Sequence, residues 1–142
     1  MTTENMITEK KYLMPTTISD ALQMAEANAG EFKFIAGGTD IMANRFQGNE
    51  RSVCLIDITK IIDLKGIKSD SDFLRIGSLE VLEDLKTKPE IQVEFPLLIE
   101  AALSVGSPLL RKTATIGGNV LCENRCIYYN QSEWWRDSVG YC

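Results

Sequence analysis

Short apolar runs alternate with polar or glycine-containing turns along the first sixty residues, a pattern that predicts alternating helices and strands. Apolar residues recur at helical spacing from Ile18 onwards, and Gly30 occupies a typical helix-ending position. Residues 32–36 then suit a buried strand, and the nearly all-apolar residues 53–57 suit a second strand covered on both faces. Asp57 ends that strand and is expected to cap the following turn. The short helix-to-strand connection predicts a small α/β layer.

The pattern changes in the middle of the chain. Residues 67–77 predict a hairpin whose polar turn holds the acidic tract 69–72. A solvated turn explains that tract better than a calcium loop, because the later ligands of such a loop are missing. Ser78 is expected to cap a helix that ends before Pro89, and residues 96–105 predict a further helix.

The turn after residues 32–36 is the first stretch that suggests chemistry. It has the sequence Ala-Gly-Gly-Thr-Asp, and its two glycines permit positive φ and let another group approach the backbone. Thr39 and Asp40 are good N-cap residues for a helix that begins near Ile41. A strand, a glycine turn and a helix together leave backbone N–H groups around a small hollow, which is how many proteins hold phosphate. An ordinary tight turn explains this stretch alone equally well.

A second glycine pair follows residues 110–116 and repeats this arrangement. Thr115 precedes the pair and Asn119 follows it, at the edge of an apolar run. Two such loops could clasp one extended ligand from two sides, with Thr115 and Asn119 supplying hydrogen bonds. Each pair alone is weak evidence, and the two together leave the ligand unidentified.

Composition and charge narrow the classes of function. The chain has 142 residues, of which 44% are hydrophobic and 25% charged, as in ordinary globular domains. Its net charge of −5 argues against nucleic acid as a partner, and its only local basic excess is 111–112. Neither a membrane-spanning run nor a signal peptide is recognisable, so a cytoplasmic location is expected. Histidine is absent, which excludes Ser-His-Asp catalysis and histidine-ligated metal within this chain.

One of the four cysteines lies in the first half of the chain, and the other three lie near its end. Cys54 lies inside the predicted strand 53–57 and is expected to belong to the core. Cys122, Cys126 and Cys142 cluster near the end of the chain, which indicates metal or redox work in a reducing compartment.

The two glycine segments together resemble the FAD-binding subunit of the molybdenum hydroxylases, the xanthine and carbon monoxide dehydrogenase group. The resemblance covers nearly the whole chain from Tyr12. The segments that carry it, in the family's order, are 36–40, 55–58, 74–77, 96–102, Arg111 and 115–119. It implies an α+β fold, the FAD-binding domain of the vanillyl-alcohol-oxidase or PCMH type. A small α/β subdomain would occupy residues 1–60, and the first part of a second α+β subdomain residues 61–121.

This resemblance implies that FAD lies between the two glycine segments, and that the chain has no catalytic residue of its own. The residues implied on the pyrophosphate side are Phe34, Ile35, Ala36, Gly37, Gly38, Thr39, Asp40 and Ile41. Those implied on the side nearer the flavin ring are Thr115, Gly118, Asn119 and Leu121. Backbone N–H groups would bind the phosphates with help from the Thr39 hydroxyl. Asp40, being acidic, would cap the helix or bind a ribitol hydroxyl.

Residues 122–142 resemble the start of the insertion in the FAD subunit of 4-hydroxybenzoyl-CoA reductase, which carries an extra [4Fe–4S] cluster. Cys126 and Cys142 match its ligands, whereas Cys122 lies outside the pattern. A zinc knuckle and plain aromatic packing are the alternatives. The family's cluster needs further cysteines, and the rest of its FAD domain is missing, so the sequence is expected to be an N-terminal fragment.

The resemblance implies an electron-transfer flavoprotein subunit. Electrons would come from an external carrier such as ferredoxin, enter at the [4Fe–4S] cluster and pass through FAD. A [2Fe–2S] small subunit and a molybdenum-cofactor large subunit would then receive them. The alternatives are the FAD subunit of an ordinary molybdenum hydroxylase, or a truncated scaffold or metal-binding module without catalysis.

Overall fold

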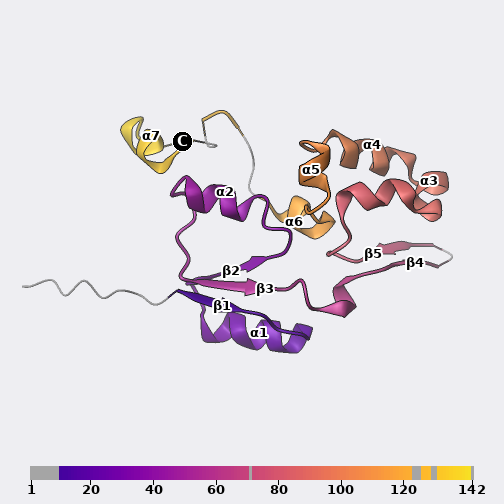
Figure 1. The fold of residues 1–142 in the computed structure, drawn as a ribbon, viewed down its shortest axis with the longest axis horizontal. Helices are drawn as coiled ribbons and strands as arrows, with labels where there is room; N and C mark the ends of the chain where they lie inside the picture. The colour runs from indigo at the N-terminus through magenta and orange to yellow at the C-terminus, as the bar shows by residue number, and fades with distance from the viewer. Residues whose placement is uncertain (1–9, 71, 123–125, 129–130, 142) are drawn as a thin grey trace, which may run out of the picture.

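The computed structural model describes residues 10–70, 72–122, 126–128 and 131–141 (Figure 1). In its first part, strands and helices alternate as the apolar pattern predicts. The elements in chain order are β1 (Lys11–Leu13), α1 (Ile18–Ala27), β2 (Phe32–Ile35), α2 (Ile41–Phe46) and β3 (Cys54–Asp57).

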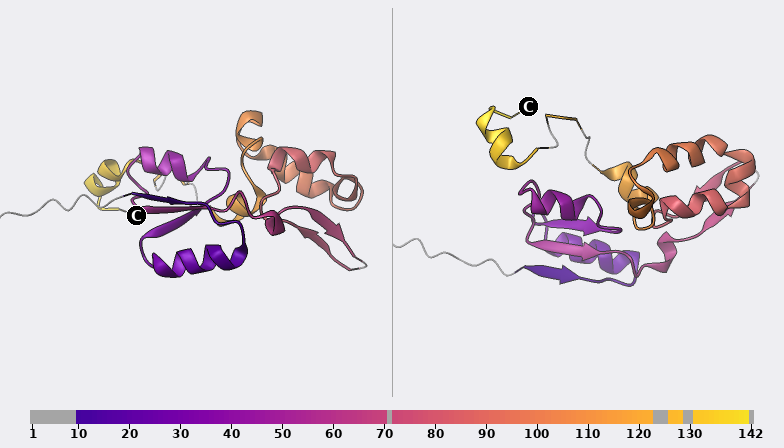
Figure 2. Two further views of the ribbon diagram at one scale, coloured as in Figure 1. Left: turned by 60° about the horizontal axis from the view of Figure 1, so that its bottom comes forward. Right: turned by 45° about the horizontal axis from the view of Figure 1, so that its top comes forward.

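These three strands form a parallel sheet in the order β1-β3-β2. All four residues of β3 are buried, as its apolar sequence predicts for a central strand. Helix α1 covers one face of the sheet and α2 lies on the other (Figure 2). Ala25 of α1 packs with Cys54 and Ile56 in one hydrophobic cluster, so the prediction that Cys54 belongs to the core is confirmed.

The second part holds a β-hairpin and a group of short helices. Its elements are the 3-10 helix η1 (Ile62–Leu64), β4 (Ile67–Ser69), β5 (Leu74–Ile76), the 3-10 helix η2 (Leu82–Thr87), α3 (Pro89–Glu94), α4 (Pro96–Ser104), α5 (Pro108–Arg111), α6 (Ile116–Leu121) and α7 (Glu133–Ser138). A second hydrophobic cluster joins the hairpin to η2, α3 and α4, and its buried members are Leu82, Leu85, Ile91, Ala102 and Ala114. The fold is the predicted mixture of helices and sheets.

The predicted hairpin is confirmed, and its acidic turn is structural. Strands β4 and β5 are antiparallel, with Ile67 opposite Ile76. The Asp70 carboxylate accepts hydrogen bonds from the backbone N–H groups of Asp72 and Phe73, both at 3.2 Å. This is the ordinary way in which an aspartate closes a turn.

The helix predicted to start at Ser78 is wrong in its start and its type. Residues 78–82 run instead beside residues 114–117, with hydrogen bonds from Leu82 N to Ala114 O (3.0 Å) and from Ile116 N to Glu80 O (2.8 Å). Residues 78–79 form a turn, and the pairing keeps Val81 extended just before η2 begins at Leu82.

Helix α3 is an element that the sequence pattern missed. Pro89 was expected to follow a helix, but it occupies the first turn of α3. Proline is well tolerated at this position, because an N–H group of the first turn has no partner within the helix. Within the described residues, no helix is long and apolar enough to cross a membrane.

Candidate functional site

The turn between β2 and α2 forms a cradle of backbone N–H groups, here called the glycine cradle (residues 36–41). Its amide groups that donate no hydrogen bond within the described part of the chain are those of Ala36, Gly37, Gly38, Thr39 and Ile41. Gly38 has φ of +72°, which residues with a Cβ rarely adopt. A run of unsatisfied N–H groups at a helix start attracts an anion.

Gly37 lets this turn lie directly against the segment that leads into α6. A Cβ on Gly37 would lie 2.7 Å from the carbonyl carbon of Thr113 and closer still to its oxygen. The two glycine segments are therefore neighbours, and α6 lies beside the β2–α2 turn (Figure 1). The predicted proximity of the two segments has a steric basis, because only glycine leaves room for this crossing.

The expected helix cap by Asp40 is not made. Asp40 occupies the N-cap position of α2, but its side chain makes no capping hydrogen bond. Its Oδ2 atom instead accepts a hydrogen bond from Asn44 Nδ2 at 3.0 Å, one helical turn further on. The first turn of α2 thus keeps N–H groups that a side-chain cap would otherwise occupy.

Two hydrophobic residues of β2 lead into the cradle. Ile35 is buried. If Gly38 carried a Cβ atom, that atom would lie 3.4 Å from Ile35 Cδ1. Phe34 is 44% exposed and packs edge-to-face with Phe32, with ring centroids 5.2 Å apart. Ile35 therefore supports the turn from below, whereas Phe34 presents an aromatic surface beside it.

The second glycine segment is the first turn of α6, so its interpretation as a loop like the first is wrong. Thr115 caps the helix, since its Oγ1 accepts a hydrogen bond from Gly118 N at 3.2 Å. Gly117 N donates to Ser78 O at 2.9 Å, and a Cβ on Gly117 would lie 2.6 Å from Ser78 Cβ. Because of the pairing with residues 78–82, the amide groups of Ile116 and Gly117 are not available to bind a ligand.

This side of the site consequently offers side chains and surface rather than backbone N–H groups. Gly118, Asn119 and Leu121 are exposed, and Thr115 is buried with 6% of its surface accessible. The two segments are close together but differ in chemistry, because the amides of residues 116–119 all donate hydrogen bonds within the described residues, whereas those of residues 36–39 do not.

Asp57 lies at the carboxyl end of the central strand and does cap the next turn, as predicted. Its Oδ1 accepts a hydrogen bond from Thr59 N at 2.8 Å. Its Oδ2 accepts one from the Tyr12 hydroxyl at 2.5 Å, a contact that the sequence did not indicate. Burial raises the pKa of Asp57, but the bonds from Thr59 and Tyr12 and the Lys60 charge together hold it below its usual value. The Tyr12 pKa is raised, mainly because its hydroxyl donates to Asp57.

The cysteine-rich end of the chain is only partly described. Cys126 is exposed, Cys122 Sγ donates a hydrogen bond to Asn119 O at 3.1 Å, and Cys142 lies outside the described residues. Among the residues that the structure describes, no three His, Cys, Asp or Glu side chains gather closely enough to hold a metal ion.

Comparisons with known proteins agree with this geometry. Residues 6–133 match the family described as "FAD binding domain in molybdopterin dehydrogenase". The chain is 34% identical over 110 residues to the xanthine dehydrogenase FAD-binding subunit of Escherichia coli O157:H7, covering 77% of this chain and 37% of that protein. It is 34% identical over 113 residues to the carbon monoxide dehydrogenase medium chain of Hydrogenophaga pseudoflava, covering 78% of this chain and 38% of that protein.

A solved structure of the carbon monoxide dehydrogenase from Hydrogenophaga pseudoflava, which lacks the Mo-pyranopterin moiety, has a similar fold. The TM-score is 0.76 at 30% sequence identity, and the match covers 79% of this chain and 39% of that chain. This chain therefore spans less than two fifths of the length of the relatives that it matches.

Proposed function

Because the chain belongs to the family of FAD-binding domains in molybdopterin dehydrogenases, we propose that it forms part of the FAD site in the flavoprotein subunit of a molybdenum-dependent oxidoreductase. One observation carries the proposal: the glycine cradle presents five backbone N–H groups that no described group accepts, directly beside the start of α6. FAD, when bound, would accept and pass on electrons, and this chain's contribution is to hold and orient it.

The residues of the cradle fit a pyrophosphate. The N–H groups of residues 36–39 would donate to phosphate oxygens, and the Thr39 hydroxyl would add a further donor. Asp40 is held by Asn44, so its carboxylate is suited to a ribitol hydroxyl rather than to phosphate. Phe34 and Ile35 would support the bound cofactor from β2.

Residues of α6 would line the other side of the cofactor. Asn119 and Leu121 are exposed there, and we propose that they lie nearer the flavin ring, with Gly118 allowing close approach. The Thr115 hydroxyl already accepts a hydrogen bond from Gly118 N, but its own proton is available to donate.

The finer proposal is a subunit similar to that of 4-hydroxybenzoyl-CoA reductase. Cys126 and Cys142 would be two thiolate ligands of a [4Fe–4S] cluster, completed by sequence beyond this chain. Electrons from a carrier such as ferredoxin would enter at the cluster, cross FAD and continue to a [2Fe–2S] subunit and a molybdenum subunit. Cys54 and Cys122 are free thiols, which suits a reducing compartment, so we propose a cytoplasmic location.

The FAD subunit of an ordinary molybdenum hydroxylase is the second candidate. Its support is the similarity to the xanthine and carbon monoxide dehydrogenase subunits. The match of Cys126 and Cys142 to two cluster ligands of the reductase subunit favours the first candidate.

The placement of the pyrophosphate is tested by Gly38→Val. A branched side chain at φ of +72° would strain the turn and crowd the side chains of Ile35 and Met42. We therefore expect the variant to lose FAD, measured as flavin absorbance after gel filtration. Gly30→Val is the matched control, because Gly30 has φ of +82° and open space around it. Equal flavin content in both variants would show that the pyrophosphate lies elsewhere.

The cluster is tested separately by iron and acid-labile sulfide analysis, beside a flavin spectrum, on protein prepared anaerobically with its downstream sequence. Cys126→Ser should lower the iron content and Cys122→Ser should not. Flavin without iron in the unmodified protein would support the ordinary hydroxylase subunit instead.

A further inference from the structure

Asn49 and Arg51, which follow α2, contact residues near the carboxyl-terminal end of the described chain. Residues 131–141, here called the tail, contact these two residues through three side-chain interactions. Asn49 Nδ2 donates to Gln131 O at 2.8 Å, and Asn49 Oδ1 accepts from Arg136 Nη1 at 3.3 Å. The Arg51 guanidinium pairs with the Glu133 carboxylate. These five residues, here called the clasp, join parts of the chain more than 80 positions apart.

The clasp is itself built on the end of α2. Asn49 N donates to Asn44 O at 2.9 Å, and Gly48 N donates to Arg45 O at 3.2 Å. The clasp residues 49 and 51 therefore follow α2 without a flexible connection, and α7 lies close to α2 (Figure 1). A shift of this helix would therefore move clasp residues 49 and 51 with it.

The same helix begins at the glycine cradle, and Asn44 connects its two ends. The Asn44 side chain donates to Asp40 in the cradle, and its backbone oxygen accepts from Asn49 N. Asn49 then contacts Gln131 and Arg136 of the tail. A continuous path of hydrogen bonds thus runs from the cradle to the tail over one helix of six residues.

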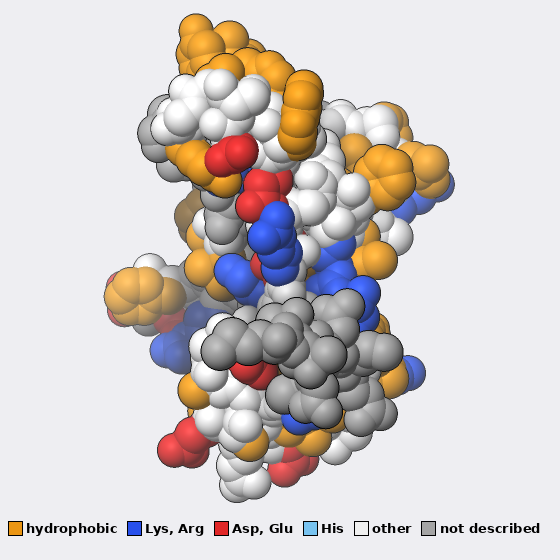
Figure 3. Space-filling view, turned by 90° about the vertical axis from the view of Figure 1, so that its left-hand side faces the viewer, with side chains coloured by type: hydrophobic (Ala, Val, Ile, Leu, Met, Phe, Trp, Pro, Cys, Tyr) orange, Lys and Arg blue, Asp and Glu red, His pale blue; other side chains and the backbone are white. Residues whose placement is uncertain are grey.

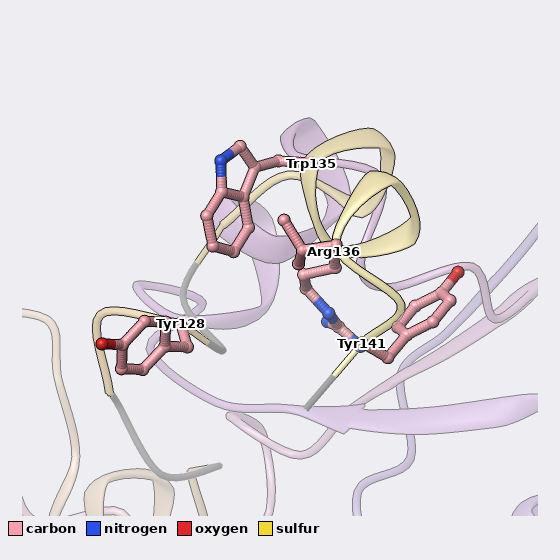
Figure 4. Close-up of a pocket in the computed structure, with 5 residues that line it drawn as sticks. Tyr128, Trp135, Arg136 and Tyr141 are labelled. Atoms are coloured by element: carbon pink, nitrogen blue, oxygen red, sulfur yellow. The ribbon is translucent and has the colours of Figure 1, made fainter.

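Within the tail, the clasp residue Arg136 also shapes an aromatic hollow. Its guanidinium carbon lies 5.5 Å from the centre of the Tyr141 ring (Figure 4). The hollow has a volume of about 350 Å³, and its lining residues are Tyr128, Trp135, Arg136, Val139 and Tyr141. Hydrophobic side chains gather on this end of the molecule, above charged ones (Figure 3). Loss of the clasp would therefore disturb the surroundings of the tail's aromatic rings.

We propose that the clasp couples FAD binding at the glycine cradle to docking of the tail, with Asn44 and Asn49 as positioning residues. The inference rests on the proposed function, because the cradle must bind the pyrophosphate. Phosphate at the start of α2 stabilises that helix in the position that the clasp requires. Coupling of this kind is reciprocal: a docked tail strengthens FAD binding, and FAD favours the docked tail.

Charge reversal of the ion pair tests the coupling. Trp134 and Trp135 are the only tryptophans and both lie in α7, so their fluorescence reports on docking. Arg51→Glu should move their emission to longer wavelength and weaken FAD binding on the order of five- to tenfold. Glu133→Arg in the same chain should restore both. Asn49→Ala should act like Arg51→Glu, and ADP, which carries a pyrophosphate but no flavin, should reverse part of the emission change.

The control is Arg75→Glu, because Arg75 is an exposed residue of the β4–β5 hairpin. It should leave both FAD affinity and tryptophan emission unchanged. An Arg51→Glu variant with altered emission but unaltered FAD affinity would overturn the coupling while leaving the proposed function intact. Failure of the unmodified chain, prepared with its downstream sequence, to bind FAD would overturn both.

Discussion

At the scale of single residues, the contact between Tyr12 and Asp57 has a consequence for pH dependence. The Asp57 pKa is lowered from 3.8, so its stabilising contribution is present above that pH and is lost as the pH falls towards the folded-state pKa. The Tyr12 pKa is raised from 10.0, so its contribution is present below that pH and is lost as the pH rises further. The hydrogen bond therefore stabilises the fold between these limits.

We expect Tyr12→Phe to reduce the free energy of unfolding by about 1 kcal/mol at neutral pH. This value is at the low end for a bond to a charged group because Tyr12 is 55% exposed. Urea unfolding at pH 3, 7 and 11 would measure it. The difference between the variant and the unmodified chain should be largest at pH 7; a difference that does not change with pH would show that the hydroxyl does not act through its bond to the ionised Asp57.

At the scale of elements, Arg111 joins three helices of the second part. Its Nε donates to Glu83 of η2 at 2.8 Å. Its Nη1 donates to three backbone oxygens at or just after the end of α4, those of Leu103, Val105 and Gly106, at 2.9–3.2 Å. The lysine at position 86 and Arg111 together hold the pKa of Glu83 below its usual value. Arg111 thus satisfies carbonyls that the end of α4 would otherwise leave without partners.

Arg111→Met should be strongly destabilising for this reason. Arg111 is only 8% exposed, and removal of one partner of a buried charge network costs about 3 kcal/mol. Urea unfolding followed by circular dichroism would measure the loss. Arg75→Met is the comparison, since Arg75 is exposed, and its effect should be below about 0.5 kcal/mol. Similar losses in both variants would contradict this role of Arg111.

At the scale of the whole molecule, the crossing of Gly37 and Thr113 brings together parts that have separate cores. The first core lies around β3, and the second lies between η2 and the helices that follow it. The predicted division into one subdomain at residues 1–60 and a second at residues 61–121 stays a prediction. The crossing places the glycine cradle at the boundary between the two cores, where α6 is within reach of the same ligand.

Gly37→Ala should loosen this junction. The added methyl group would collide with the backbone of Thr113, which cannot rotate away, so we expect a loss of about 1–3 kcal/mol together with weaker FAD binding. Gly30→Ala is the control, because Gly30 lies between α1 and β2, outside the glycine cradle, and has open space around it. Denaturant unfolding and flavin titration would measure both properties, and equal effects from the two substitutions would argue against the junction.

The sequence by itself determined those features that depend only on residues close together in the chain. The apolar run of β3 predicted burial on both faces, the glycine pair after β2 allowed the positive φ that Gly38 adopts, and the polar turn after Ser69 predicted a hairpin. Steric freedom and hydrophobic periodicity act within a few residues, so they are visible in the sequence. The resemblance of the two glycine segments to an FAD-binding family was carried by the residues of the motifs and their order along the chain.

Only the tertiary structure decided which backbone groups remain available. In the second glycine segment, Ile116 N and Gly117 N pair with residues 78–82, and Gly118 N donates to the Thr115 side chain. The amides of residues 36–39, by contrast, meet no acceptor within the described part of the chain. The clasp between Asn49 and the tail depends on a contact across 82 positions. Such pairings follow from how separate elements pack against one another. The sequence shows that a residue has a hydrogen-bond donor, but it does not show which distant group accepts from it.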